Sequence, residues 1–261
     1  MFFGGIALAV IVAIAAMASR MAGSDTALGT QNASAVVHCD AKPAPSVDLH
    51  GCDLRDIPLM GTDLSYANLE QADLRGADLT QTDFTQARLK KALLAGAKLV
   101  DADFEGANLE SADLAAANAA DADFQGAALA RATLDRANLA HADLKADLRF
   151  ASLISSNLNG SQLVGADLTG ANLSDALLDG TDLESANLTR ANLNRAQVSG
   201  AGLVRTILRF ADLSFADLSY SNFTQTDMEN SDATGADLTG ARWFETKCPD
   251  GRIQEGTTPC M

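Results

Sequence analysis

The sequence has 261 residues, of which 47% are hydrophobic, 5% are aromatic and 20% are charged. A collagen-like chain is excluded because glycine does not recur at every third position, and a disordered chain is excluded by the high apolar content. The net charge of -15 argues against direct binding to nucleic acid, and the scarcity of aromatic residues predicts a core of small, uniform side chains.

The N-terminus contains an apolar run, residues 2–19, without a charged side chain. As an α-helix this run would span about 27 Å, close to the thickness of a bilayer core. The run and the Ala-Met-Ala triplet at 16–18 favour a signal peptide, although no Lys or Arg precedes Arg20. A membrane anchor is the main alternative, for which Arg20 places the body in the cytoplasm; a buried helix is another. We assign residues 1–19 to a signal peptide or membrane anchor and residues 20–38 to a linker.

A five-residue repeat follows. From Leu49 an apolar residue, usually Leu, recurs at every fifth position to Leu144, and the same spacing runs from Leu148 to Trp243. A small residue, mostly Ala, stands two positions before these centres, so the unit is Ala-(Asp/Asn)-Leu-x-x. In a helix, steps of about 100° would spread the leucines around the cylinder, which excludes a helix. In extended backbone the small residue and the Leu share an inward face and the last two residues turn the chain, which predicts a coiled solenoid.

A longer period indicates the number of sides in each coil. Centres 20 residues apart include the phenylalanines at 84, 104 and 124, and an aspartate precedes each centre of this column. The aspartates are Asp63, Asp83, Asp103, Asp123 and Asp143. Four units per coil would stack the rings inside the rod and the carboxylates outside it. We therefore predict four-sided coils, about ten in all.

One residue is missing from the repeat between Leu144 and Leu148. We expect a shortened corner there and a change of phase that ends the aspartate column at Asp143. A deletion tolerated at a corner is the preferred interpretation. A bend that joins two shorter rods is the alternative.

Four cysteines flank the repeat as two pairs, Cys39 with Cys52 and Cys248 with Cys260. The terminal coils of a solenoid need caps, and a disulfide that closes a loop of about 13 residues stabilises a protein by about 3 kcal/mol. We predict that disulfides staple both ends, with Cys52 as the one cysteine in a repeat position. Zinc bound by the first pair and its two neighbouring histidines is an alternative, but the spacing matches no standard zinc pattern. Disulfides require an oxidising compartment, which favours export.

Units such as Ala-Asn-Leu-Glu-Gln at 67–71 and Ala-Asp-Leu-Thr-Gly at 166–170 resemble those of the pentapeptide repeat family. The resemblance covers about four-fifths of the chain. It implies an all-β fold, a right-handed quadrilateral β-helix with the Leu and the small residue inside. We assign this β-helix with its N-terminal cap to residues 39–247 and a disulfide-linked tail to 248–261, all preceded by one N-terminal apolar helix. The resemblance implies almost nothing about function.

Motifs of nucleophilic catalysis, phosphate binding and dinucleotide binding are absent, and the three histidines are too scattered to form a general-base site. We therefore predict no enzyme activity, no cofactor and no metal. The outward carboxylates are interpreted first as solvated side chains that form local turn bonds. The sharper interpretation is that the column from Asp63 to Asp143 is a ladder for a divalent cation or a basic protein surface. Its like charges, about 4.8 Å apart, repel by about 1 kcal/mol per pair even in water.

The main functional hypothesis is a non-catalytic exported scaffold or protein-interaction module, periplasmic or extracellular, with an acidic surface and an unknown protein partner. It would contact a membrane through residues 2–19 if these are not cleaved. The alternative is a DNA-mimicking rod that binds a topoisomerase or another DNA-binding protein, as some pentapeptide repeat proteins do. The acidic charge of the chain favours mimicry. Export and the absence of a long helix after Trp243 argue against it.

Overall fold

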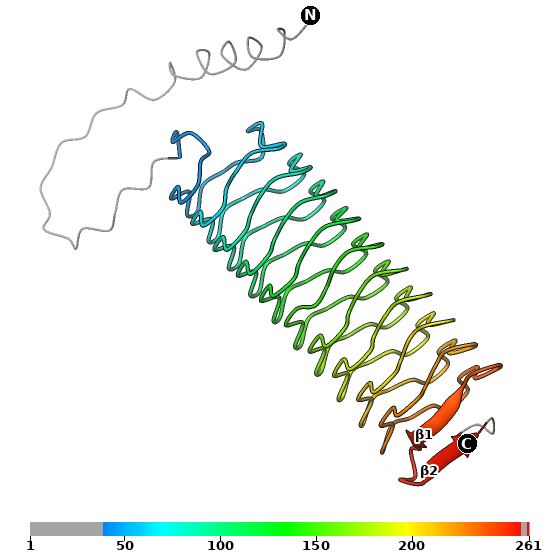
Figure 1. Ribbon diagram of the computed structural model, residues 1–261. Coiled ribbons are helices and arrows are strands. Elements are labelled where there is room, and N and C mark those ends of the chain that lie inside the picture. Colours follow the sequence, from blue (N-terminus) through cyan, green and yellow to red (C-terminus); the bar gives the residue numbers. More distant parts are fainter. Residues whose placement is uncertain (1–38, 257–259, 261) are drawn as a thin grey trace, which may run out of the picture. The chain divides into compact units, whose positions relative to one another are not determined.

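The computed structural model describes residues 39–256 and Cys260. The expected signal peptide or anchor with its apolar helix, and the linker, lie outside these residues, so those assignments stay predictions. Within the described part of the chain no helix is long and apolar enough to cross a membrane. The described chain is a rod of stacked coils that ends in a short β-hairpin (Figure 1).

The rod has four sides, each held by a ladder of parallel bridges between outward residues of successive coils. We number the sides in chain order: face 1 begins at Asp48, face 2 at Asp53, face 3 at Asp78 and face 4 at Asp63. Outward residues pair with the residue 20 positions later, except where the ladders cross the deletion. Face 1 runs through ten successive bridges to Lys247. The predicted four-sided coils, about ten in number, are confirmed.

Each position of the repeat has a local role in forming the corner. The N–H of the small residue bonds to the carbonyl of the preceding Leu, as Ala77 does to Leu74 at 3.1 Å, which closes a β-turn. The residue before the small one has a positive φ, and Gly76 at 68° adopts it at no steric cost. The outward Asp or Asn accepts the N–H two residues later, as Asp103 does from Glu105 at 2.8 Å. The two variable residues of the repeat therefore form the corner, and the hydrogen bond of the outward Asp or Asn stabilises the beginning of that turn.

The interior of face 4 holds the aromatic column. Phe84, Phe104 and Phe124 are fully buried, and their rings stack in parallel with centroids 4.9 and 4.8 Å apart. The same face later carries Phe223 and Trp243, whose rings stack at 4.5 Å. The sequence analysis placed only Phe84, Phe104 and Phe124 in this column and missed Phe223 and Trp243. That assignment was wrong because the missing residue shifts the later members by one position from the spacing of 20.

The deletion shortens one corner and leaves the four faces continuous. Ala146 N donates to Leu144 O at 2.7 Å, so a three-residue turn replaces the usual four-residue turn. Across this corner the bridged residues are 19 apart, as in Asp143 with Gln162, and they return to 20 apart afterwards. The run of aspartates ends at Asp143 as expected, because Gln162 is the next outward residue of face 4, but the ladder of bridges on this face continues without a break. The rod passes through this point as one body (Figure 1).

Disulfides join the two predicted cysteine pairs, one at each end of the rod. Cys52 is buried in the first coil and bonds to Cys39, which ties the preceding loop to that coil. Cys248 bonds to Cys260 and is also buried. Cys248 follows Trp243 by five residues and lies inside face 1 just after Lys247, so it too has a repeat position, contrary to the prediction.

The C-terminal end is closed by the hairpin of β1 (Trp243–Lys247) and β2 (Ile253–Gly256), which pair antiparallel with a bulge. β1 also continues the rod, since Lys247 bridges Asp227 in parallel. The sequence analysis assigned residues 248–261 to a tail and did not predict β2. The Pro-Asp-Gly turn at 249–251 is the signal that could have identified the hairpin.

Candidate functional site: the acidic face

The predicted aspartate column forms one continuous ladder on face 4. Asp63 bridges Asp83, and the bridges continue in order through Asp103 and Asp123 to Asp143. We call these five residues the acidic ladder. Adjacent strands lie about 4.8 Å apart, so the five carboxylates extend over about 19 Å of one side of the rod.

Turn hydrogen bonds fix the carboxylates of the acidic ladder. Asp83, Asp103 and Asp123 each accept the N–H two residues later at 2.8 Å. Asp63 accepts both the hydroxyl and the N–H of Ser65, and these bonds hold the pKa of Asp63 below its ordinary value. The carboxylates are thus held at regular intervals before any partner arrives.

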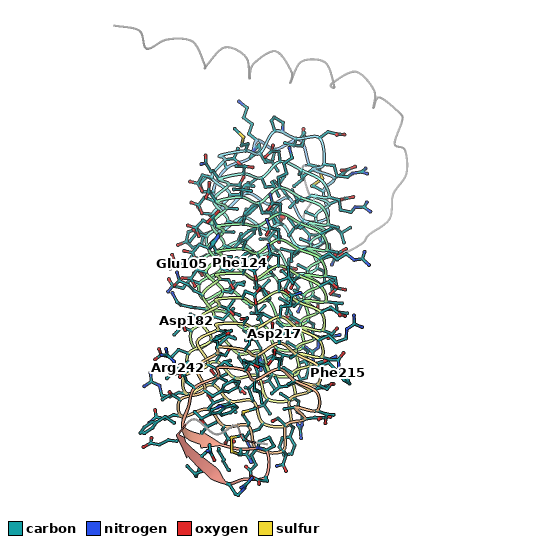
Figure 2. The ribbon with its side chains drawn as sticks, turned by 90° about the vertical axis from the view of Figure 1, so that its right-hand side faces the viewer. Glu105, Phe124, Asp182, Phe215, Asp217 and Arg242 are labelled. Carbon is teal, nitrogen blue, oxygen red and sulfur yellow. A yellow bond between two sulfur atoms is a disulfide. The ribbon has the colours of Figure 1, made fainter. Side chains whose placement is uncertain are left out.

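Within the described residues, the three central carboxylates of the ladder, those of Asp83, Asp103 and Asp123, form no ion pair with Lys or Arg. Asp143, at the end, bonds to the ammonium group of Lys145 at 2.7 Å. The corner positions on either side of this face, taken from residue 60 to residue 141, contain Asp101, Glu105 and Asp121, and none of these corner positions holds a Lys or Arg. Glu105 lies on the same side of the rod as two later outward residues of face 4, Asp182 and Arg242, which are labelled in Figure 2.

The first two carboxylates of face 2, those of Asp53 and Asp73, are neutralised by contrast. Arg55 forms ion pairs with Asp53 at 2.6 Å and with Asp73 in the next coil at 3.5 Å, and Arg75 pairs with Asp73 at 2.6 Å. The side-chain hydrogen bond from Arg55 lowers the pKa of Asp53 to about 2. The three central carboxylates of the acidic ladder differ from Asp53 and Asp73 in their lack of an ion pair, and they differ from other unpaired outward carboxylates in that they follow one another in successive coils of one face.

Exposed aromatic side chains occupy several corners, and the sequence analysis did not identify them. Arg131 lies over the Phe150 ring at 5.6 Å, and Arg190 lies over Phe210 at 5.7 Å. The Phe150 ring also covers Gly170 of the next coil, where an added Cβ would lie 2.7 Å from the ring. An aromatic residue at the corner, with Gly 20 residues later, was the available sequence signal.

Metal binding gains no support from the described residues. Cys39 and Cys52 are bonded to each other, so their sulfurs are not thiolate ligands of the alternative zinc site. The described residues contain no group of three or more His, Cys, Asp or Glu side chains suited to a metal ion.

The chain matches the sequence model of the pentapeptide repeats in eight copies. The matched segments are 46–81, 77–114, 112–145, 145–170, 166–209 and 206–242. No significant match is found among curated proteins.

Three solved structures illustrate the likeness. HetL from the cyanobacterium Nostoc, a pentapeptide repeat protein involved in heterocyst differentiation regulation, is 30% identical, with 80% of this chain and 90% of HetL covered and a TM-score of 0.41. QnrB1, a plasmid-mediated fluoroquinolone resistance protein, is 20% identical, with 75% and 90% covered and a TM-score of 0.39. A pentapeptide repeat protein from the Arabidopsis thaliana thylakoid lumen is 32% identical, with 49% and 72% covered and a TM-score of 0.16. With repeat matches across most of its length, the chain belongs to the pentapeptide repeat family, whose fold is a right-handed quadrilateral β-helix.

Proposed function

We propose that this protein is a non-catalytic, exported interaction scaffold that presents the acidic ladder to a basic surface of a partner protein. The observation that carries the proposal is the stack of carboxylates on face 4, whose three central members, Asp83, Asp103 and Asp123, form no ion pair within the described residues. Complementary charge steers association and specifies which surfaces meet. A partner that places Lys or Arg side chains along the ladder would relieve the repulsion between its neighbouring carboxylates.

Preorganisation supports a binding role for this face. The turn hydrogen bonds and the regular coil spacing hold the carboxylates in place, so a partner does not bear the entropy of ordering them. The fit is to an extended basic segment or a row of basic side chains, because the ladder is linear and about 19 Å long.

Export is supported by the two disulfides, which persist in oxidising compartments. The apolar run at residues 2–19 has the composition of a signal peptide or an anchor. A reporter fused after Met261 that is active only in the periplasm would agree with export. A reporter active only in the cytoplasm would overturn it.

The test of the acidic ladder uses two triple variants of equal net charge. One replaces Asp83, Asp103 and Asp123 by Asn. The control replaces Asp113, Asp217 and Asp227 by Asn; these lie on three other faces, accept the same turn hydrogen bond and form no ion pair within the described residues. Figure 2 labels Asp217 of this control set.

Both variants are titrated calorimetrically with an oligolysine peptide at low and moderate salt. We expect the ladder variant to bind several-fold more weakly than the control, with a reduced salt dependence, because three adjacent contacts are lost from one face. Equal weakening in the two variants would show that net charge alone attracts the peptide, and the proposal would fail. Capture of partners from a periplasmic fraction with the same pair then identifies proteins that depend on the ladder.

A DNA mimic is the second candidate, favoured by the local density of charge. One coil, which rises about 4.8 Å along the rod, contains the three carboxylates of Asp101, Asp103 and Glu105. Their linear charge density is close to that of duplex DNA, which carries one charge per about 1.7 Å. Inhibition of a topoisomerase by the wild type and the control, but not by the ladder variant, would support mimicry. The same inhibition by all three proteins would exclude the ladder as its cause.

A further inference from the structure

The corner between faces 1 and 2 carries the same pair of side chains twice. Arg131 lies over the ring of Phe150 in the next coil, 5.6 Å from its centroid, and Arg190 lies over the ring of Phe210 at 5.7 Å. The two phenylalanines are 57% and 48% exposed. We call these four residues the arginine corner. Each ring holds a guanidinium group along the rod, so both cations are positioned before any partner arrives.

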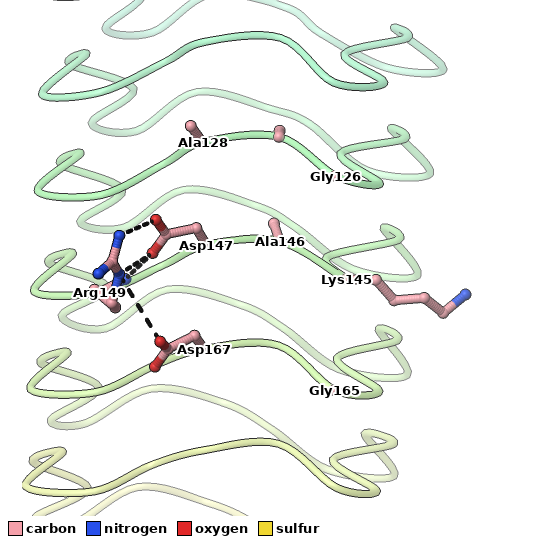
Figure 3. A pocket seen from close by; sticks show the side chains of 9 residues that line it. Gly126, Ala128, Lys145, Ala146, Asp147, Arg149, Gly165 and Asp167 are labelled. Atoms are coloured by element: carbon pink, nitrogen blue, oxygen red, sulfur yellow. Dashed lines mark hydrogen bonds and ion pairs between the residues drawn. The ribbon is translucent and has the colours of Figure 1, made fainter.

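The two guanidinium groups of the arginine corner have no acidic partner. Arg131 and Arg190 contact the rings, and within the described residues neither forms an ion pair or donates a side-chain hydrogen bond. Arg149 of the same corner is different, since it pairs with Asp147 at 2.6 Å and approaches Asp167 at 3.8 Å (Figure 3). The N–H donors of the two unpaired guanidinium groups are therefore available to carboxylates of another molecule.

The spacing of the arginine corner matches that of the acidic ladder. Arg131 and Arg190 are three coils apart, because three bridges of face 1 lead from residue 128 to residue 187. Both side chains reach into the next coil, so the two guanidinium groups remain about 14 Å apart. Asp63 and Asp123 of the ladder are likewise separated by three bridges of face 4. Two such rods side by side can therefore bring both arginines onto carboxylates at once.

The apolar side chains beside the two surfaces also correspond. At the corner between faces 3 and 4, Met60 stands three residues before Asp63, and Ala120 stands three residues before Asp123. Met60 is 64% exposed. The backbone hydrogen bonds of this corner separate the two positions by three coils. Contact with them would remove part of the two exposed phenylalanine rings from water, which favours association.

We propose that the arginine corner of one copy of this protein binds the acidic ladder of a second copy. Arg131 and Arg190 of one rod pair with Asp63 and Asp123 of the other, and the phenylalanine rings lie against the corner beside that ladder. The inference rests on the proposed function of the acidic ladder and names its partner. The arginine corner is diagonally opposite the corner between faces 3 and 4. One copy can therefore use both surfaces, and the rods associate in open rows.

The net charge of -15 does not prevent this contact. At physiological salt the Debye length is about 8 Å, so charges on distant parts of two rods are largely screened. Side chains that meet directly lie within that length, and their attraction is retained. At about 1 M salt the Debye length falls to about 3 Å, and the association should weaken.

Analytical ultracentrifugation of the full-length protein over a series of concentrations tests the inference. The corner variant replaces Arg131 and Arg190 by Gln, which Gln71 already provides at this corner with the same positive φ. The control replaces Arg136 and Arg242 by Gln; these lie on another corner and on face 4 and form no ion pair within the described residues. We expect the corner variant to associate about tenfold more weakly than the wild type, since two charge-assisted contacts are lost. The control should associate as the wild type does.

A mixture of two variants tests the pairing of the surfaces directly. The corner variant keeps its acidic ladder, and the variant with Asn at 83, 103 and 123 keeps its arginine corner. Each should associate weakly alone, whereas an equal mixture should form a 1:1 complex that does not grow, because one complementary contact remains. No complex in the mixture, or equal weakening in the corner variant and its control, would overturn the inference. A monomeric wild type would also overturn it, and the function of the ladder would stand if its variant still bound oligolysine more weakly than its own control.

Discussion

Replacement of Phe104 by Asp is expected to unfold the middle of the rod. Phe104 is fully buried, and its ring lies between those of Phe84 and Phe124. Loss of a buried phenylalanine costs about 3–5 kcal/mol. An unpaired carboxylate in the apolar interior adds several kcal/mol. The sum is comparable with the total stability of many domains, about 5–15 kcal/mol.

Phe104→Leu is the matched control, because Leu64 and Leu144 already occupy this inner column. It should lose about 1–3 kcal/mol, mainly from the two ring stacks of about 0.5–1.5 kcal/mol each. Coils contact only their neighbours, so damage in the Asp variant should separate the two halves of the rod and broaden the transition. Thermal and urea unfolding followed by far-UV circular dichroism measures both effects.

The size of the destabilisation should also depend on the protonation state of the carboxyl group introduced at position 104. Burial raises the pKa of a carboxyl group at position 104 above its unfolded value near 4. The destabilisation should therefore be complete at pH values above the folded pKa and should diminish as the pH falls toward the unfolded pKa. If Phe104→Asp melts within a few degrees of Phe104→Leu at pH 7, position 104 is not enclosed as described.

Three further outcomes are expected. Reduction of the two disulfides should lower the melting temperature and fray the ends while the central coils keep their circular dichroism; thiol labelling of the unreduced native protein that modified all four cysteines would contradict this. The ladder variant with Asn at 83, 103 and 123 should be as stable as the wild type or slightly more stable, with the larger gain at low salt, because repulsion is removed; a loss of stability in urea titrations would contradict it. The hydrogen bond from the Thr80 hydroxyl holds the pKa of Asp78 below its ordinary value, so its stabilising effect is present above about pH 4 and is lost as the pH falls through the folded pKa. Thr80→Val should raise the pKa of Asp78 in an NMR titration, and an unchanged value would refute the assignment.

The four-sided coil follows from the sequence because each repeat forms its own corner. The small residue, the outward Asp or Asn and the Leu have local roles that recur without change, and each coil packs only on its neighbours. The stacking of Asp83 on Asp103 could therefore be predicted from a spacing of 20 residues. The pairing of the cysteines could also be predicted from the sequence, since the two members of each pair lie close together at one end of the repeat.

The tertiary structure alone decided how the deletion is absorbed and which charges are compensated. A missing residue can bend the rod or shorten one turn, and the choice depends on whether Ala146 N can reach Leu144 O. That turn keeps the faces aligned and places Phe223 and Trp243 in the same column as Phe104. Ion pairs depend likewise on the reach of long side chains between coils, which residue spacing does not specify. The sequence by itself therefore determined the repeat and its acidic column, whereas three-dimensional contacts determined that the three central carboxylates of this column form no ion pair within the described residues and that one shortened turn absorbs the deletion.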